Sequence, residues 1–147
     1  MDQSLPDTPA ETPGYELDVQ VGFLLRRATQ RHLAIFAAHI PDLTSTQFAA
    51  LAKLCAEGPS SQNALGRMTA MDAATIKGVI DRLRAKGLVS AARDAEDQRR
   101  VTLSPTPEGR ATYEAAVAAA HRITAETLAP LDEQERETFL ALLAKLT

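Results

Sequence analysis

The chain contains 147 residues, a net charge of −3 and a single cysteine. This length is enough to bury a hydrophobic core, and no apolar run approaches the ~20 residues that a membrane-spanning helix requires. One cysteine excludes a disulfide framework within the chain, and no spacing of Cys and His residues is typical of a metal site. We therefore expect one compact domain without membrane contact, metal or cofactor.

Residues 1–14 differ in composition from the rest of the chain. They are rich in Pro, Thr and acidic residues, and they lack the basic start and apolar centre of a signal peptide. Such a segment buries too little apolar surface to fold by itself. We expect a flexible tail here, a single domain over residues 15–147, and a cytoplasmic location.

Residues 15–40 predict a long helix with a broad apolar face. The apolar positions are Leu17, Val21, Leu24, Leu25, Leu33, Phe36 and Ile40. This apolar face is too wide to be buried against one small part of the same chain, so we expect a partner surface to cover it. The same helix carries five basic or titratable side chains: Arg26, Arg27, Arg31, His32 and His39.

A capping box opens the second predicted helix, with Thr44 as the cap and Gln47 reaching back to it. Gly58 and Pro59 end this helix. Its inward stripe consists of Phe48, Leu51, Leu54 and Cys55. Because the cysteine shares that stripe, we expect it to belong to the core rather than to act as a reactive thiol.

Two short helices separated by only three residues are predicted next. Ser60 is the expected cap of the first, and Asp72 is the expected cap of the second, which runs from Ala73 to about Lys86. The buried stripe of the second helix consists of Ile76, Val79, Ile80 and Leu83. Its more exposed residues are Ala73, Ala74, Thr75, Lys77, Gly78, Asp81, Arg82 and Arg84. Small residues at the start of a helix permit close approach to another molecule.

Residues 87–105 predict a β-hairpin with a charged tip. Gly87 ends the preceding helix, and Leu88 and Val89 begin a strand. In the returning strand Val101 and Leu103 alternate with polar neighbours at the period of a half-buried strand. Between the strands lies a polar, turn-prone run with two arginines after it, at residues 94–100.

The chain closes with two predicted helices. Thr106 and Pro107 are a cap and a first helical residue, and the stripe that follows is Tyr113, Val117, Ala120, Ile123 and Leu128. Asp132 and Glu135 form a second capping box. The last helix carries Phe139, Leu140, Leu143 and Leu146.

Charge is unevenly distributed along the chain. Residues 60–110 hold nine Lys and Arg against six Asp and Glu, whereas the remainder holds seven against thirteen. The basic part coincides with the two short helices and the hairpin. This partition is expected when one lobe meets phosphate groups and the rest keeps the protein soluble.

From Thr44 to about Leu128, the sequence resembles the MarR family of bacterial transcription regulators. The most specific similarity lies in the hairpin, where the family has Asp, one residue, Arg, and an alternating strand leading to Leu-Thr and a glycine. The corresponding residues here are Asp97, Arg99, Val101, Leu103, Pro105, Thr106 and Gly109. Pro105 departs from the usual leucine. Because proline cannot donate to a ladder, we expect it to shorten the second strand and to leave the hairpin more mobile.

The resemblance implies a mainly α fold with a small β-hairpin, divided into a winged helix-turn-helix lobe and a helical dimerisation lobe. The winged lobe would cover residues 44–106, and the dimerisation lobe residues 15–40 and 107–147. In this arrangement Arg99 would enter the minor groove of DNA, and Asp97 would hold it by a charge-assisted hydrogen bond. The implied DNA contacts are Ser61, Gln62, Asn63, Ala73, Ala74, Thr75, Lys77, Gly78, Arg82, Asp97, Arg99 and Arg100.

The resemblance also implies a homodimer on a pseudo-palindromic operator and a small-molecule effector, such as an aromatic acid or its CoA thioester. Candidate effector ligands are Arg26, Arg27 and His32, because arginine pairs with carboxylates in a bidentate manner. Alternatively, these side chains are solvated, or the basic ones pair with acidic residues of the same or the partner chain. We interpret the protein as a ligand-responsive regulator and, more specifically, as a repressor.

Other functions are less consistent with the sequence. No glycine-rich phosphate loop, His-Glu-x-x-His motif or nucleophile elbow is present, so catalysis is not indicated. A charged hairpin by itself is also compatible with a solvated surface loop, and the long terminal helices with a helical hairpin inside a monomer. A winged-helix module that binds proteins instead of DNA is the main alternative. Such a module would have no reason to present Arg99 beside the basic residues at 77–86.

Overall fold

The computed structural model describes residues 13–147, and residues 1–12 of the expected tail lie outside the described part. A 3-10 turn, Leu17–Val19, comes before helix α1. The elements that follow it are α1 (Val21–His39), α2 (Ser45–Glu57), α3 (Gln62–Met68), α4 (Ala73–Ala85), β1 (Val89–Arg93), β2 (Val101–Pro105), α5 (Pro107–Thr127) and α6 (Glu133–Lys145). The fold is therefore mainly helical with one antiparallel hairpin, as predicted.

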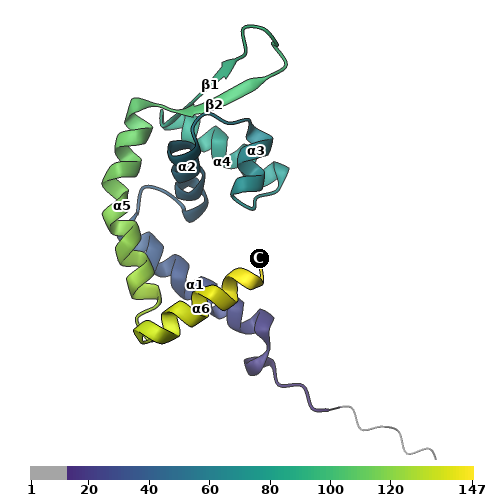
Figure 1. The fold of residues 1–147 in the computed structure, drawn as a ribbon, viewed down its shortest axis with the longest axis vertical. Helices are drawn as coiled ribbons and strands as arrows, with labels where there is room; N and C mark the ends of the chain where they lie inside the picture. Colours follow the sequence, from purple (N-terminus) through teal and green to yellow (C-terminus); the bar gives the residue numbers. More distant parts are fainter. Residues whose placement is uncertain (1–12) are drawn as a thin grey trace, which may run out of the picture.

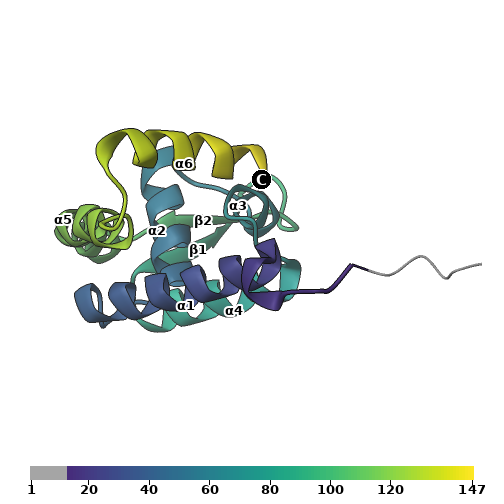
Figure 2. The ribbon, with the colours of Figure 1, turned by 90° about the horizontal axis from the view of Figure 1, so that it is seen from below.

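The elements are arranged in two regions joined by the long helix α5. Helices α2, α3 and α4 lie together, with the hairpin projecting beyond them (Figure 1). Helix α5 begins at the base of the hairpin and runs down one side of the molecule to α1. Viewed from below, α5 lies beside α1, and α6 extends separately from the end of α5 (Figure 2). In the described part of the chain, no helix has both the length and the apolar character needed to cross a membrane.

The helix starts follow the capping chemistry of the sequence. Both predicted capping boxes are present, at Thr44 with Gln47 and at Asp132 with Glu135. Thr106 caps α5 by accepting a hydrogen bond from the Gly109 N–H at 3.0 Å, and Pro107 is the first residue of that helix. These side chains satisfy backbone donors that have no partner within the helix.

The first helix is shorter than predicted. One helix was predicted over residues 15–40, but Gln20 has extended backbone angles (φ −82°, ψ 140°) and separates the 3-10 turn from α1. Asp18 and Val19 have low helix propensity, which favours a break at this point. At the other end Ile40 precedes a proline, and the steric demands of proline disfavour a helical conformation in the residue before it.

The predicted cap of α3 was also wrong by one residue. Ser61 is the cap, and its hydroxyl accepts a hydrogen bond from the Ala64 N–H at 3.1 Å. Ser60 instead pairs with Leu103 of β2 through two backbone hydrogen bonds of 3.0 and 2.8 Å. The segment before α3 is thereby joined to the outer edge of the hairpin.

Pro105 does not shorten the second strand, contrary to the prediction. It is the last residue of β2 and lies opposite Val89 in the register. Leu103 directs its N–H away from β1 and toward Ser60. Since strand residues two apart point the same way, position 105 faces that outer side as well. Proline at position 105 therefore removes no hydrogen bond between β2 and β1. The next bond across the hairpin is donated by the Thr106 N–H to the Leu88 carbonyl at 3.0 Å.

The core lies between α2, α3 and α4 and extends into the base of the hairpin. Its completely enclosed side chains are Leu51, Leu54, Leu65, Ile76, Ile80 and Leu83. An aromatic series continues the core toward the other region. Phe36 of α1 lies 6.0 Å from Phe48 of α2, which lies 5.9 Å from Tyr113 of α5, measured between ring centroids.

Gly109 permits the closest approach between α5 and the hairpin. A Cβ atom at this position would lie 2.0 Å from the Leu88 carbonyl oxygen. The Thr106 hydroxyl, meanwhile, donates to the Gly87 carbonyl at 2.7 Å, and Gly87 has a positive φ of 74°. The end of α4, both strands and the start of α5 therefore meet within a few residues. We call residues 87–88 and 106–109 the α5 junction.

Replacing Gly109 by alanine should destabilise the protein, because the added Cβ forces α5 away from Leu88. We expect the free energy of unfolding to fall by ~1–3 kcal/mol, as is typical of overpacking. Chemical denaturation followed by circular dichroism at one fixed protein concentration measures this change.

Gly78→Ala is the matched control. Gly78 lies inside α4, and the nearest atom to an added Cβ is an Arg82 guanidinium nitrogen at 3.6 Å. Here alanine should raise the free energy of unfolding by up to ~1 kcal/mol. Equal stability of the two variants would contradict the proposed role of the junction.

Candidate nucleic-acid interface

Helix α4 presents its predicted outward residues to solvent. Ala73, Ala74, Thr75, Lys77 and Arg82 are exposed, and Gly78 is half-buried. The opposite stripe, Ile76, Val79, Ile80 and Leu83, is buried as expected. The first two turns of α4 therefore offer a surface with few bulky side chains, which suits a helix that enters the major groove.

Asp72 fixes the start of α4. Its carboxylate accepts a hydrogen bond from the Thr75 N–H at 2.7 Å, and this bond lowers the pKa of Asp72. The carboxylate is therefore ionised at neutral pH. Because the folded pKa is depressed, the stabilising effect of this cap is present above the unfolded pKa and is lost as pH falls through the folded pKa.

The predicted contact between Asp97 and Arg99 is present in a different form. The Asp97 carboxylate accepts a hydrogen bond from the backbone N–H of Arg99 at 3.1 Å, and its carbonyl accepts one from the Arg100 N–H at 3.0 Å. Within residues 13–147 the two side chains make no ion pair. This is an Asx-type turn, in which the short carboxylate reaches the backbone two residues on. Asp97 thus shapes the loop through the backbone and does not bind the Arg99 guanidinium.

A polar groove lies between the hairpin and the start of α3. Its volume is about 500 Å³, and it is lined by Pro59, Ser60, Ser61, Gln62, Asn63, Arg99, Arg100, Val101 and Thr102. Five of the predicted DNA contacts are therefore brought together although they are almost forty positions apart in the sequence. Two guanidinium groups beside hydroxyl and amide side chains form a site suited to phosphate oxygens.

Some contacts around this groove were not predicted. The pairing of Ser60 with Leu103 joins the segment before α3 to β2, and it has no local sequence signal. Arg93 donates to the Gln98 carbonyl at 3.0 Å and holds the returning loop. An ion pair between Lys77 and Asp81 of α4 was also not predicted, although their i, i+4 spacing makes it possible.

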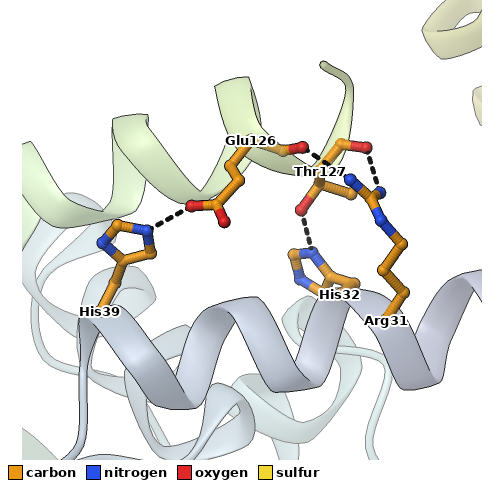
Figure 3. Close-up of polar contacts among 5 residues, drawn as sticks. All are labelled: Arg31, His32, His39, Glu126 and Thr127. Carbon is orange, nitrogen blue, oxygen red and sulfur yellow. Dashed lines mark hydrogen bonds and ion pairs between the residues drawn. The ribbon is translucent and has the colours of Figure 1, made fainter. Parts of the chain in front are cut away.

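The basic residues of α1 mostly contact the end of α5 (Figure 3). Arg31 donates to the carbonyls of Thr127 at 2.6 Å and Glu126 at 2.9 Å. His32 lies 2.9 Å from the Thr127 hydroxyl, and His39 lies 2.6 Å from the Glu126 carboxylate. We call these five residues the α1–α5 clamp. It supplies a donor to the Thr127 carbonyl at the helix end and a further donor to the Glu126 carbonyl, which already accepts a backbone hydrogen bond from the Ala129 N–H.

Only one of the three predicted effector ligands borders a cavity in this region. A largely apolar cavity of about 300 Å³ lies between α1, α5 and α6, and His32 lines it together with Thr124, Thr127, Phe139 and Leu140, among others. Arg27 instead lies over the Phe23 ring, with its guanidinium carbon 5.8 Å from the ring centroid. Arg26 is exposed on the same helix and does not line the cavity.

Cys55 lies at the margin of the core and is half-buried. Burial raises the pKa of its thiol, which keeps it protonated at neutral pH. Among residues 13–147, no group of three or more His, Cys, Asp or Glu side chains is arranged to hold a metal ion.

Comparison with known proteins agrees with this geometry. A profile of the MarR family matches residues 42–100. The HTH-type transcriptional repressor NicR of Pseudomonas putida is 41% identical over 140 residues, covering 94% of this chain and 89% of NicR.

Two solved structures are similar over most of the chain. A probable transcriptional regulator from Pseudomonas aeruginosa has 53% identity and a TM-score of 0.87, covering 90% of this chain and all of that one. Bordetella bronchiseptica BpsR, whose DNA binding is regulated by 6-hydroxynicotinic acid, has 43% identity and a TM-score of 0.86, covering 90% of this chain and 96% of BpsR.

A helix-turn-helix followed by a basic two-stranded wing defines a winged-helix DNA-binding protein. The chain belongs to the MarR family. It is a DNA-binding transcriptional regulator and not an enzyme.

Proposed function

We propose that the protein is a homodimeric repressor that binds a pseudo-palindromic operator and is released from it by a small aromatic acid. The observation that carries DNA recognition is the polar groove between α3 and the wing, and the exposed face of α4 is consistent with it. The groove places Arg99 and Arg100 next to the α3 start, where phosphate contacts fix the register of α4 in the major groove. Arg99 extends from the wing toward the minor groove.

Exposed apolar side chains on α1 and α6 support a dimer. Val21, Leu24 and Leu25 of α1 are 63%, 48% and 43% exposed, and Leu142 and Leu146 near the chain end are 55% and 70% exposed. Burial of such surface is favourable at about 25 cal/mol per Å². A two-fold dimer would place its two α4 helices in successive major grooves, ~34 Å apart, and the operator would share that symmetry.

The similarity to BpsR, whose DNA binding is regulated by 6-hydroxynicotinic acid, supports an aromatic acid as the effector. In this proposal His32 contacts the acid at the apolar cavity that it lines. Arg26 and Arg27 do not line the cavity, so one of them would have to turn toward it to supply a cation for the carboxylate. The cavity volume of about 300 Å³ favours the free acid over the much larger CoA thioester. By thermodynamic linkage, the acid and the operator weaken each other's binding by the same factor.

Arg99→Ala should weaken operator binding by ~1–3 kcal/mol and flatten its dependence on salt, because one cationic contact per protomer is lost. Fluorescence anisotropy with a duplex from the gene's own promoter, measured over a salt series, gives both quantities. Arg122→Ala, which removes an exposed arginine of α5, is the matched control and should leave both nearly unchanged. The wing has no part in binding if the two variants behave alike.

Substitutions in α1 should separate effector response from DNA binding. For the His32→Ala variant, the concentration of 6-hydroxynicotinic acid needed to release DNA should rise at least about tenfold. Its affinity for DNA without the acid should stay within about twofold of the parent. Arg26→Ala and Arg27→Ala identify which cation takes part. Nicotinic acid, benzoic acid and benzoyl-CoA extend the series of probes. Parent-like release in all three variants would place the effector site elsewhere.

A further inference from the structure

The outward face of α4 carries an acidic residue where the proposed function expects DNA. With 100° between successive residues, the buried stripe places Asp81 on the opposite side of the helix, near Ala74 and Gly78. Asp81 is exposed. A carboxylate in this position repels the phosphates of any duplex that approaches, and it therefore weakens binding that depends on charge alone.

Asp81 is engaged by a basic neighbour one helical turn earlier. The Lys77 ammonium lies 2.8 Å from the Asp81 carboxylate, with side chains that are 67% and 53% exposed. This hydrogen bond is the main cause of the lowered pKa of Asp81, to which Arg84 and Arg82 also contribute. The Asp81 carboxylate is therefore ionised at neutral pH.

Helix stability does not account for the pair. Exposed ion pairs contribute little to folding, and an acid placed four residues before a lysine is more favourable than the reverse order found here. On the other side of α4, the Arg82 guanidinium lies near Gly78. No ion pair involves it in the described part of the chain, so its charge remains available to phosphates.

An ion pair on a groove-facing helix has both donors and acceptors to offer. Lys77 keeps two N–H donors, and Asp81 keeps a second oxygen with unused lone pairs. In the major groove, guanine presents the O6 and N7 acceptors, and its cytosine partner presents the N4 amino donor. The pair is therefore complementary to a G·C base pair, whereas toward a phosphate it presents almost no net charge.

We propose that Asp81 is a specificity-determining residue. Its ion pair with Lys77 makes the ammonium group less available to phosphates, and the two side chains together recognise a G·C base pair in the operator. This inference rests on the proposed function, since it requires α4 to lie in the major groove. Lys77 then contributes little to binding on random DNA and contributes fully at the correct site. The unpaired Arg82 supplies affinity that is independent of sequence.

Asp81→Asn tests the proposal on two duplexes of equal length, one from the gene's own promoter and one of random sequence. Because Lys77 is freed, the variant should bind random DNA roughly three- to tenfold more tightly. The slope of log affinity against log salt concentration should become steeper by about one unit per protomer. Promoter affinity should stay the same or fall, so the ratio of promoter to random affinity decreases. Circular dichroism and denaturation verify that the variant is folded.

Two controls isolate the pair from the general effect of charge. Glu114→Gln removes the same charge from an exposed position on α5 and should shift both duplexes by one equal, small factor. In a Lys77→Ala background, Asp81→Asn should change binding to random DNA and its salt dependence clearly less than in the parent, because the repulsion by the carboxylate is relieved but no lysine is freed. An equal gain on both duplexes, or an unchanged effect in the Lys77→Ala background, would overturn the inference. A parent protein that does not distinguish the promoter from random DNA would instead overturn the proposed function.

Discussion

The contact between Gly109 and the Leu88 carbonyl is the constraint on which the rest of the structure depends. Only a residue without a side chain allows α5 to begin this close to β1. At the same place the Thr106 hydroxyl, after β2, donates a hydrogen bond to the carbonyl of Gly87, after α4. These contacts together fix the position of the wing relative to α4. Any motion of α5 at this end must therefore move both DNA-facing elements together.

The other end of α5 is held by the α1–α5 clamp. Arg31, His32 and His39 all contact the last two residues of α5, and these contacts span two turns of α1. Helix α5 is thus anchored at both ends, once by backbone packing and once by polar side chains. Ala119 and Ile123 also pack this part of α5 into the core. The clamp includes His32, which lines the cavity, so a ligand bound there would lie beside this end of α5.

Features set by local chemistry were predictable from the sequence. The capping boxes, the cap at Asp72, the buried stripe of α4 and the hairpin all depend on residues within a few positions of one another. The structure agrees with each of them. The family resemblance was confirmed, and it too rests on a contiguous motif.

Features set by distant contacts were not predictable. Ser60 was assigned as a cap because nothing near it reveals its pairing with Leu103. Pro105 was expected to shorten the second strand, because its outward orientation follows only from that same pairing. The expected bond between the side chains of Asp97 and Arg99 failed because the turn brings the carboxylate to the backbone instead. The polar groove itself is formed by segments that only the tertiary fold brings together.

The pairing of Ser60 with Leu103 also bears on how the protein behaves at high concentration. The free edge of a hairpin can recruit strands from other molecules and start aggregation. On the outer edge of β2, Ser60 covers the N–H of Leu103, and proline at position 105 has none to offer. Near its root, the β2 edge of the wing is therefore closed to strand addition, and two wings cannot join edge to edge through this part of β2.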